Sequence, residues 1–251
     1  MKILATMVCT LLLVLAGNPA AFAGTTMSIV YADYQPYSWS ENGRARGLEI
    51  DVLDEALGKR MGIALNHTIL PWSRAQLSVK SGTADAFVAT SNKTRSEFAI
   101  HGNVPVAYWE LSLFVRAGDH RFANVKALAD LAPFKIGSLI GNGWIMENLP
   151  GMDVHYVERM DLLPKMLTAN HIDVVADNSY VMHYALMMSG EADKVEELPL
   201  SLSTSPMYLY IGKNSAFASI RQKFDQTIIQ MRNDGTLMQI YNRYKNALSD
   251  H

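Results

Sequence analysis

Short strand-like runs alternate with helical patterns along most of this chain, and that order restricts it to a small set of folds. A strand–helix–strand–helix–strand order is typical of a largely parallel sheet with helices on its faces. The alternation resumes near residue 111 and closes with a strand at 207–213, so we expect two similar α/β halves. The first round is predicted at residues 27–32, 48–61, 64–70, 72–80 and 84–90.

Two amphipathic helices are predicted at the end of the chain, because apolar side chains recur there at intervals of three and four residues. Gly235 is expected to end the first of these helices and Thr236 to cap the second. The apolar stripes of the two helices are Phe217, Ile220, Phe224, Ile228 and Met231, and then Leu237, Ile240, Tyr241 and Tyr244.

The first 23 residues are predicted to be a cleaved signal peptide and not part of the fold. Lys2 precedes an almost unbroken apolar run of 14 residues at 3–16, and Ala21 and Ala23 match the small residues of a signal-peptidase site. We therefore expect export to the periplasm, with Gly24 as the first residue of the mature chain.

The single cysteine, Cys9, lies inside that apolar run. A lipid anchor requires a cysteine at the first mature position, so no anchor is expected. The mature chain then holds no cysteine, which excludes disulfides, a cysteine nucleophile and thiolate metal ligands. Its stability must come from core packing.

Charge and hydropathy exclude several other classes of protein. The chain has 22 basic and 24 acidic side chains, and this balance argues against a nucleic-acid partner, which would need a strongly basic face. An apolar content of 49% is too high for intrinsic disorder. No window of 18 to 20 residues is apolar enough to predict a membrane-spanning helix.

Signatures of catalysis and of cofactor binding are absent from the sequence. It contains no Gly-x-Ser-x-Gly elbow, no His-Glu-x-x-His, no Walker loop and no Rossmann glycine pattern. Its seven histidines have no spacing typical of metal ligands. We expect neither a metal nor another cofactor.

Aromatic and polar residues follow the first three predicted strands. In an open α/β sheet, ligands bind beyond the carboxyl ends of the strands, so these side chains are expected to meet in one crevice. They are Tyr34, Trp72, Thr90, Ser91 and Arg95.

Two charged residues allow two interpretations each. The Arg95 guanidinium suits a ligand carboxylate, or it forms a surface ion pair with an acid such as Glu97. Asp177 ends an apolar strand, where it accepts hydrogen bonds from a ligand ammonium group or caps the helix that begins near Asn178.

Several short motifs, taken in order, resemble family 3 of the bacterial extracellular solute-binding proteins, the periplasmic receptors of polar-amino-acid ABC importers. The resemblance covers nearly the whole mature chain. Its most specific parts are Tyr34, Pro36 and Tyr37; residues 47–52 (GLEIDV); Gly82, Asp85 and Ala86; Thr94 and Arg95; residues 128–131 (LADL), 135–137 (KIG), 173–177 (DVVAD) and 235–237 (GTL).

The resemblance implies the type II periplasmic-binding-protein fold, in which two α/β lobes joined by two crossover strands close on a ligand. The first lobe would comprise residues 24–108 and 207–251, and the second residues 109–206. The expected function is capture of a small polar solute, an amino acid or related carboxylate, and its delivery to an ABC permease by a monomeric receptor.

The resemblance also implies roles for individual residues. Tyr34 would stack on the ligand, Trp72 would line the side-chain pocket, and Thr90 and Ser91 would supply polar contacts. Arg95 would bind the α-carboxylate and Asp177 the α-ammonium group. Three further ligand contacts are expected at Gly141, Asn142 and Trp144, where backbone N–H groups begin a helix; Trp144 and Tyr108 would make the pocket more aromatic than a receptor for basic amino acids requires.

Two other functions remain open on the same fold. One is a dehydratase-type enzyme, since periplasmic dehydratases resemble this family, but its candidate acid–base groups form no recognisable pair. The other is a ligand sensor without a transporter. The enzyme candidates are Glu49, Asp51, His101 and Glu110.

Overall fold

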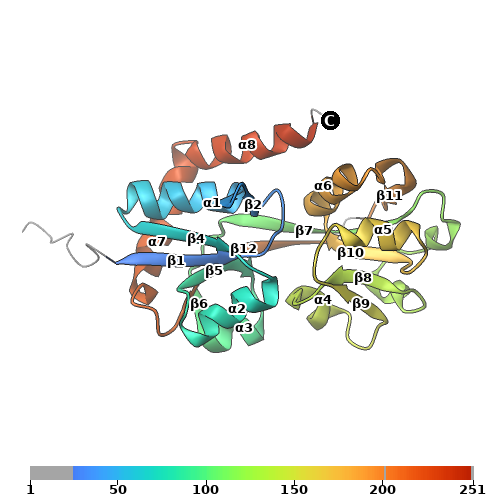
Figure 1. Cartoon of the computed structure of the whole chain (residues 1–251), viewed down its shortest axis with the longest axis horizontal. Helices are drawn as coiled ribbons and strands as arrows, with labels where there is room; N and C mark the ends of the chain where they lie inside the picture. Colours follow the sequence, from blue (N-terminus) through green and yellow to red (C-terminus); the bar gives the residue numbers. More distant parts are fainter. Residues whose placement is uncertain (1–24, 201, 250–251) are drawn as a thin grey trace, which may run out of the picture.

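The computed structural model describes residues 25–200 and 202–249, with side chains as far as Lys245. The expected signal peptide lies outside the described residues. Figure 1 shows two lobes side by side, connected by two long strands. Within the described residues, no helix combines the length and the apolar character needed to cross a membrane.

Three parallel strands form the centre of the first lobe, in the order β4-β1-β5. Their bounds are β1 Thr26–Tyr31, β4 Ala64–Ile69 and β5 Ala86–Thr90. A small hairpin and one short strand complete the lobe: β2 Trp39–Glu41, β3 Arg44–Arg46 and β6 Ala99–His101. Its helices are α1 Leu48–Leu53, the π-helix η2 Asp54–Arg60, α2 Trp72–Ser81, α3 Lys93–Phe98, the 3-10 turn η6 Ala218–Ile220, α7 Arg221–Asn233 and α8 Thr236–Ser249.

The second lobe repeats this plan with the parallel order β10-β8-β9. Its strands are β8 Ile136–Leu139, β9 Val154–Val157, β10 Val174–Asn178 and the short β11 Val195–Glu197. Its helices are α4 Gly143–Asn148, α5 Leu162–Thr168 and α6 Ser179–Ser189, with 3-10 turns η3 His120–Phe122, η4 Leu128–Leu131 and η5 Ala192–Lys194.

Two ten-residue strands, β7 Ala107–Arg116 and β12 Ser203–Gly212, pass from one lobe to the other. They pair with each other, antiparallel, over residues 107–111 and 203–207. Beyond this segment β12 continues along β5, and β7 continues along β10. The expected lobe boundaries, at 108/109 and 206/207, fall inside the paired segment, and they stay predictions.

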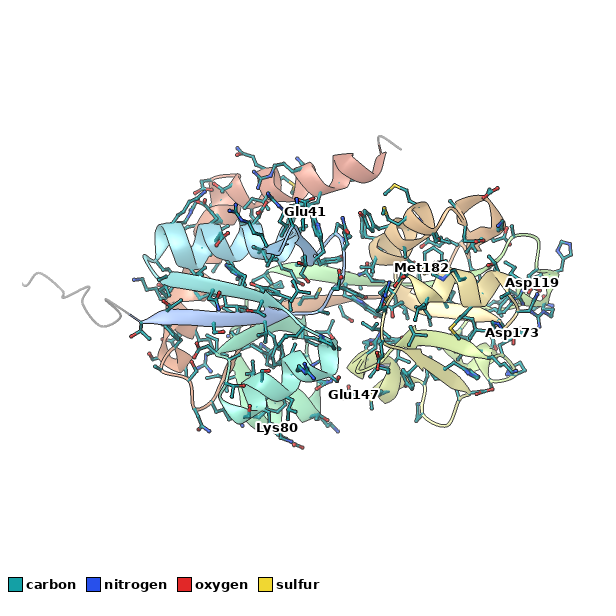
Figure 2. All side chains as sticks on the ribbon, in the orientation of Figure 1. Glu41, Lys80, Asp119, Glu147, Asp173 and Met182 are labelled. Carbon is teal, nitrogen blue, oxygen red and sulfur yellow. The ribbon has the colours of Figure 1, made fainter. Side chains whose placement is uncertain are left out.

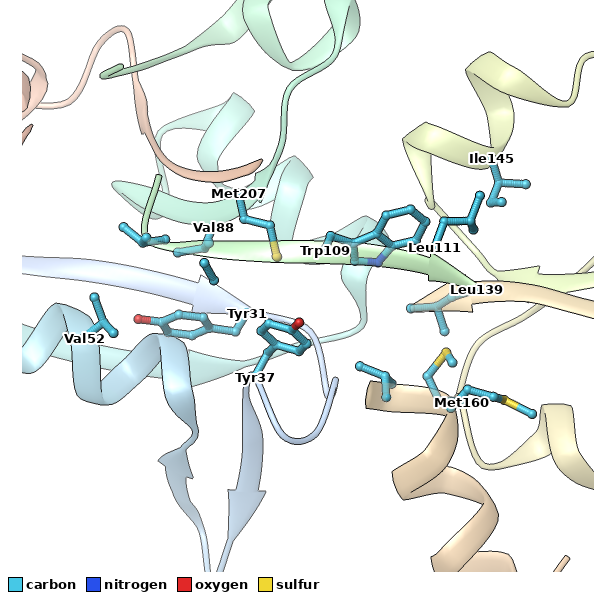
Figure 3. Packing of buried hydrophobic residues seen from close by; sticks show 14 of the residues in the cluster. Tyr31, Tyr37, Val52, Val88, Trp109, Leu111, Leu139, Ile145, Met160 and Met207 are labelled. Carbon is cyan, nitrogen blue, oxygen red and sulfur yellow. The ribbon is translucent and has the colours of Figure 1, made fainter. Parts of the chain in front are cut away.

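Most buried apolar side chains form one continuous core that runs through both lobes, and a second, smaller cluster, which includes Val79 and Phe87, lies in the first lobe. Figure 3 shows Tyr31 and Met207 on the first-lobe side, Trp109 and Leu111 on β7, and Leu139 on the second-lobe side. Because the crossover strands contribute to this core, the lobes are joined by packing as well as by the chain.

A closed charge network lies at the far end of the second lobe. Arg116 donates to the backbone carbonyls of Leu167 and Ile172 at 2.9 and 2.8 Å. Its other terminal nitrogen lies 3.1 Å from Asp119 and 3.3 Å from Asp173, and Arg121 binds the same two carboxylates. Figure 2 shows the two aspartates together at this end. Two positive and two negative charges therefore compensate one another.

The predicted fold class is confirmed, and the helices and strands differ from prediction in four respects. The sheet is parallel within each lobe, but β7 and β12 are antiparallel to their neighbours. The helix expected at 48–61 changes from α to π at Asp54. β7 begins four residues before the predicted 111. The prediction that Thr236 caps α8 is wrong: Thr236 is its first residue, and Asp234 accepts the hydrogen bond from its N–H at 3.0 Å.

Candidate functional site

A small cavity of about 70 Å³ lies between the lobes, at the carboxyl ends of β1 and β5. Such a cavity holds several water molecules or part of a small ligand. The strand-end argument predicts this place, because parallel strands direct the loops that follow them to one edge of the sheet. Five of the expected site residues line the cavity: Tyr34, Trp72, Thr90, Arg95 and Asn142.

Arg95 is held in the cavity wall by local structure. Asn92 caps the start of α3 and accepts a hydrogen bond from the Arg95 backbone N–H at 2.8 Å. The side chain is buried; its Nε donates to Gln76 at 3.1 Å, and Nη1 donates to the Thr90 carbonyl at 2.7 Å. These bonds fix the plane of the guanidinium, and Nη2 has no acceptor among the described residues.

The charge of Arg95 is uncompensated within the described residues. No carboxylate there forms an ion pair with it, and Glu97, the partner considered from the sequence, is an exposed residue. Burial lowers the pKa of the Arg95 guanidinium to about 10, because desolvation disfavours the charged form. A buried cation without a counter-ion is costly, and an anion bound in the cavity would remove that cost.

Asp177 lies directly behind the cavity and is fully buried. Its carboxylate accepts four hydrogen bonds, from the Tyr34 hydroxyl, the Asn178 backbone N–H (2.8 Å), Ser138 Oγ (3.1 Å) and Asn142 Nδ2 (3.2 Å). Burial raises its pKa, and the four donors oppose that shift. The helix α6 is capped by the Asn178 side chain, so Asp177 is not its cap.

Tyr34 and Asn142 therefore stand between Asp177 and the cavity. A ligand ammonium group would have to displace the Tyr34 hydroxyl to reach the carboxylate. The expected direct contact between Asp177 and a ligand stays a prediction. Tyr34 itself is fixed by a second bond, since Trp109 Nε1 donates to its hydroxyl oxygen at 2.8 Å.

The two lobes touch at the cavity. Trp72 of the first lobe donates from Nε1 to the Gly141 carbonyl of the second lobe at 2.9 Å. The Arg95 guanidinium carbon lies over the Trp72 ring, 5.4 Å from the ring centre. Nearby, Gly143 packs so closely on Asn92 that an added Cβ would overlap the amide. The structure is thus a form in which the lobes are in contact.

Glu49 is a cavity-lining acid that the sequence analysis considered only as an acid–base candidate. It lies one helical turn before Val52 and Leu53, on the face of α1 that packs into the first lobe, and is 3% exposed. No described side chain donates a hydrogen bond to its carboxyl group. Burial alone raises its pKa to about 8.

Eight further lining residues were missed: Tyr31, Ala32, Ser38, Val88, Ala89, Trp109, Leu139 and Met207. Tyr31 is the last residue of β1, so the strand-end argument could have found it. Trp109 escaped because β7 was predicted to begin two residues after it. Glu49 could have been found as an acid on an otherwise apolar helical face.

The other expected ligand residues do not line the cavity. Ser91 is exposed and accepts from the Tyr210 hydroxyl at 3.2 Å. Gly141 contributes its carbonyl to Trp72 rather than a donor to the cavity. Tyr108 is 49% exposed, and Trp144 packs on Trp109 with ring centres 5.6 Å apart. Tyr108 and Trp144 therefore do not line this cavity, where Tyr31 and Trp109 supply the additional rings, and the ligand contacts expected of Tyr108 and Trp144 stay predictions.

The remaining enzyme candidates lie elsewhere. Asp51 binds Arg243 at 3.0 Å and Tyr244 at 2.8 Å, on the outside of α1. His101 stacks on Tyr208, with ring centres 4.4 Å apart, and Glu110 is exposed. Of the four candidates, only Glu49 lines the cavity, and the structure pairs it with no second acid–base candidate in the described residues.

Comparisons with known proteins agree with this architecture. A Bacillus subtilis (strain 168) protein named "Probable amino-acid-binding protein YxeM" is 22% identical over 225 residues, which cover 84% of this chain and 80% of that protein. A histidine kinase sensor domain with similarity to periplasmic binding proteins superposes with a TM-score of 0.74 at 18% identity, covering 87% of this chain and 95% of that one.

An ancestral arginine-binding protein bound to glutamine superposes with a TM-score of 0.72 at 20% identity, covering 87% of this chain and 97% of that one. At these identities the structural likeness concerns the fold. The profile of the bacterial extracellular solute-binding proteins, family 3, matches residues 27–247. This chain therefore belongs to family 3 of the bacterial extracellular solute-binding proteins.

Proposed function

We propose that this protein binds an amino acid in the cavity between its lobes. The observation that carries the proposal is a pair of unmatched groups in one cavity wall: Arg95 without a carboxylate and Glu49 without a cation. An amino acid carries both complementary charges. Its carboxylate would accept from the free Nη2 of Arg95, and its ammonium group would donate to Glu49, the other unmatched group of the cavity.

Binding of this kind would favour the closed arrangement. A ligand shifts an equilibrium between open and closed forms only through contacts that are better in the closed form. Arg95 and Glu49 belong to the first lobe, and Asn142 and Asp177 to the second, so one ligand that touches both sets would stabilise their approach. The names of the relatives above support an amino acid as this ligand.

The cellular role proposed is that of a periplasmic receptor, exported by its first 23 residues, which delivers the amino acid to an ABC permease. Family membership and the printed name of the curated relative support this role. A sensor is the second candidate, because the likeness to a histidine kinase sensor domain shows that this fold also serves sensing. Uptake of radiolabelled ligand into vesicles that contain the proposed ABC permease, measured with and without this protein, would separate the two.

Thermal unfolding with each of the twenty amino acids tests the binding proposal. A ligand present at 100 times its dissociation constant stabilises the folded state by about 2.7 kcal/mol, a readily measured shift. We expect a shift with at least one amino acid and none with the same compound as its methyl ester, which cannot present a carboxylate to Arg95. An unchanged melting temperature with all twenty would refute the proposal. Recovery of a chemically altered ligand would instead indicate an enzyme.

A further inference from the structure

Two ionisable side chains without a partner, Arg95 and Glu49, line the same cavity, and they respond differently to burial. Each is 3% exposed. A guanidinium keeps its proton in proteins, whereas a carboxyl group that loses its hydration and finds no counter-charge becomes neutral. The cavity therefore holds one fixed charge, on Arg95, and one charge, on Glu49, that depends on what binds beside it.

The described residues around Glu49 supply no counter-charge. Its helix α1 packs against α8, β3 and η2, and its backbone N–H donates to the Tyr37 carbonyl at 3.0 Å. The acids Asp51, Asp54 and Glu55 on α1 and η2 have partners of their own. The basic side chains of α8, β3 and η2 are exposed or bound to surface acids: Arg44, Arg46, Lys59, Arg60, Arg243 and Lys245.

Three tyrosines from the elements around Glu49 are the other titratable groups there. Burial raises the pKa of each phenol, and the charge of Glu49 raises it further, so the phenols stay neutral where a carboxyl group titrates. Among the described residues that line the cavity there is no histidine. The tyrosines are Tyr31, bonded to His67, and Tyr37 and Tyr241, which donate to the carbonyls of Tyr108 and Val106.

Binding of an ammonium group at Glu49 therefore involves a proton. Burial raises the pKa of Glu49 to about 8, so its carboxyl group is protonated at neutral pH before a ligand binds. An ammonium group only donates hydrogen bonds and requires the carboxylate form. As it binds, the Glu49 O–H bond breaks, the proton passes to the solvent and the ammonium group keeps its three protons, so about one proton is released per ligand.

We propose that Glu49 is a specificity-determining residue with two states: it exchanges its proton for the ammonium group of an amino acid, or it keeps the proton and donates it in a hydrogen bond to the corresponding 2-oxo acid. This inference rests on the proposed function and adds a second class of ligand to the same site. A 2-oxo group only accepts hydrogen bonds, so it needs the proton that an ammonium group expels. Arg95 would bind the carboxylate of either ligand, and pH would decide between them.

Calorimetry at pH 6.5 in phosphate and in Bis-Tris, two buffers with different heats of ionisation, counts the protons released. The probes are the amino acid with the largest thermal shift and the 2-oxo acid with the same side chain, such as pyruvate for alanine. We expect about one proton released with the amino acid and none with the 2-oxo acid. Affinity for the amino acid should rise about tenfold per unit from pH 5.5 to pH 7, while affinity for the 2-oxo acid stays constant.

E49Q identifies the group that releases the proton. Glutamine does not titrate, but its amide still donates, so E49Q should bind the 2-oxo acid within a factor of about three of the wild type. Its affinity for the amino acid should be lower at pH 7, about tenfold or more, and independent of pH. D51N, which alters a surface acid of the same helix, should match the wild type. Proton release that persists in E49Q would assign the proton to Asp177, the buried acid behind Tyr34, and would overturn the inference.

The outcomes separate this inference from the proposed function. An amino acid that binds without release of a proton, or a 2-oxo acid that fails to bind at pH 5.5, refutes the inference and leaves the proposed function standing. If none of the twenty amino acids binds, the proposed function fails, and the exchange at Glu49 fails with it.

Discussion

The charges at the far end of the second lobe and those around the cavity are arranged in opposite ways. Arg116 and Arg121 meet two carboxylates and two backbone carbonyls, so every charge there has a protein partner. Arg95 is more deeply buried than either and forms no ion pair with a carboxylate of the described residues. The charges around Arg116 stabilise the second lobe by joining its segments. The charge of Arg95 remains available to bind a ligand.

Replacement of Arg95 gives the largest expected effect. R95M should weaken ligand binding about 100-fold or more, since loss of one partner from a buried charge pair costs roughly 2–5 kcal/mol. Its melting temperature without ligand should stay the same or rise, because an uncompensated buried charge is removed. Calorimetry and thermal unfolding measure the two quantities. A loss of unfolding free energy as large as the loss of binding free energy would mean that Arg95 has a structural role like that of Arg116.

Replacement of Arg116 should produce the reverse pattern. R116M leaves two backbone carbonyls and two carboxylates without their donor, so we expect unfolding free energy to fall by roughly 2–3 kcal/mol. Ligand affinity should stay within a factor of two, because the site is at the other end of the lobe. Denaturant unfolding and calorimetry on the same sample give both values; a tenfold change in affinity would contradict the contrast drawn here.

Glu49 makes the contrast dependent on pH. Its pKa is about 8 in the folded protein, against an ordinary value of 4.5. Between pH 4.5 and pH 8 the Glu49 carboxyl group is therefore protonated in the folded protein and ionised in the unfolded chain. Stability from this group is complete below pH 4.5 and is lost as pH rises towards 8, by at most about 1.4 kcal/mol per pH unit.

E49Q should remove this slope, because glutamine does not titrate. The difference in unfolding free energy between wild type and E49Q, measured from pH 5 to pH 8, should therefore shift steadily against the wild type as pH rises. D51N, which alters a surface acid of the same helix, serves as the control. A difference that is constant over this range would mean that Glu49 is solvated and ordinary.

Gly143 gives the smallest expected effect. A Cβ at this position would overlap the Asn92 amide and lie 3.2 Å from Arg95 Nη2, so G143A should hinder the final approach of the lobes. We expect about tenfold weaker binding and a smaller ligand-induced decrease in radius of gyration by X-ray scattering. G58A, where an added Cβ makes only an ordinary 3.7 Å contact with Leu65, should match the wild type.

The sequence predicted those parts of the site that depend on strand ends. Trp72, Thr90 and Arg95 lie where the alternation of strands and helices places them, because the loops after parallel strands share one edge. Helical periodicity likewise located the buried stripe of α7, including Phe224, Ile228 and Met231.

The rest of the site depends on contacts between distant segments, which local patterns do not encode. The aspartate at position 177 reads as a ligand group in the sequence, but its four donors come from three separate parts of the chain. Glu49 has no hydrogen-bond donor among the described side chains because of the apolar residues that other segments pack around it, and its own helix does not reveal this. Trp109 reaches Tyr34 only because a crossover strand passes beside the first loop.

The crossover strands have a mechanical consequence. β7 and β12 are bonded to each other where they pass between the lobes, and each continues into the sheet of a lobe. The two strands do not act as a flexible linker, so any relative motion of the lobes must bend or twist this two-stranded ribbon. The amide hydrogens that are bonded within 107–111 and 203–207, where Pro206 has none, should then exchange slowly whether the lobes are together or apart. The motion should follow one narrow path rather than a diffuse set of orientations.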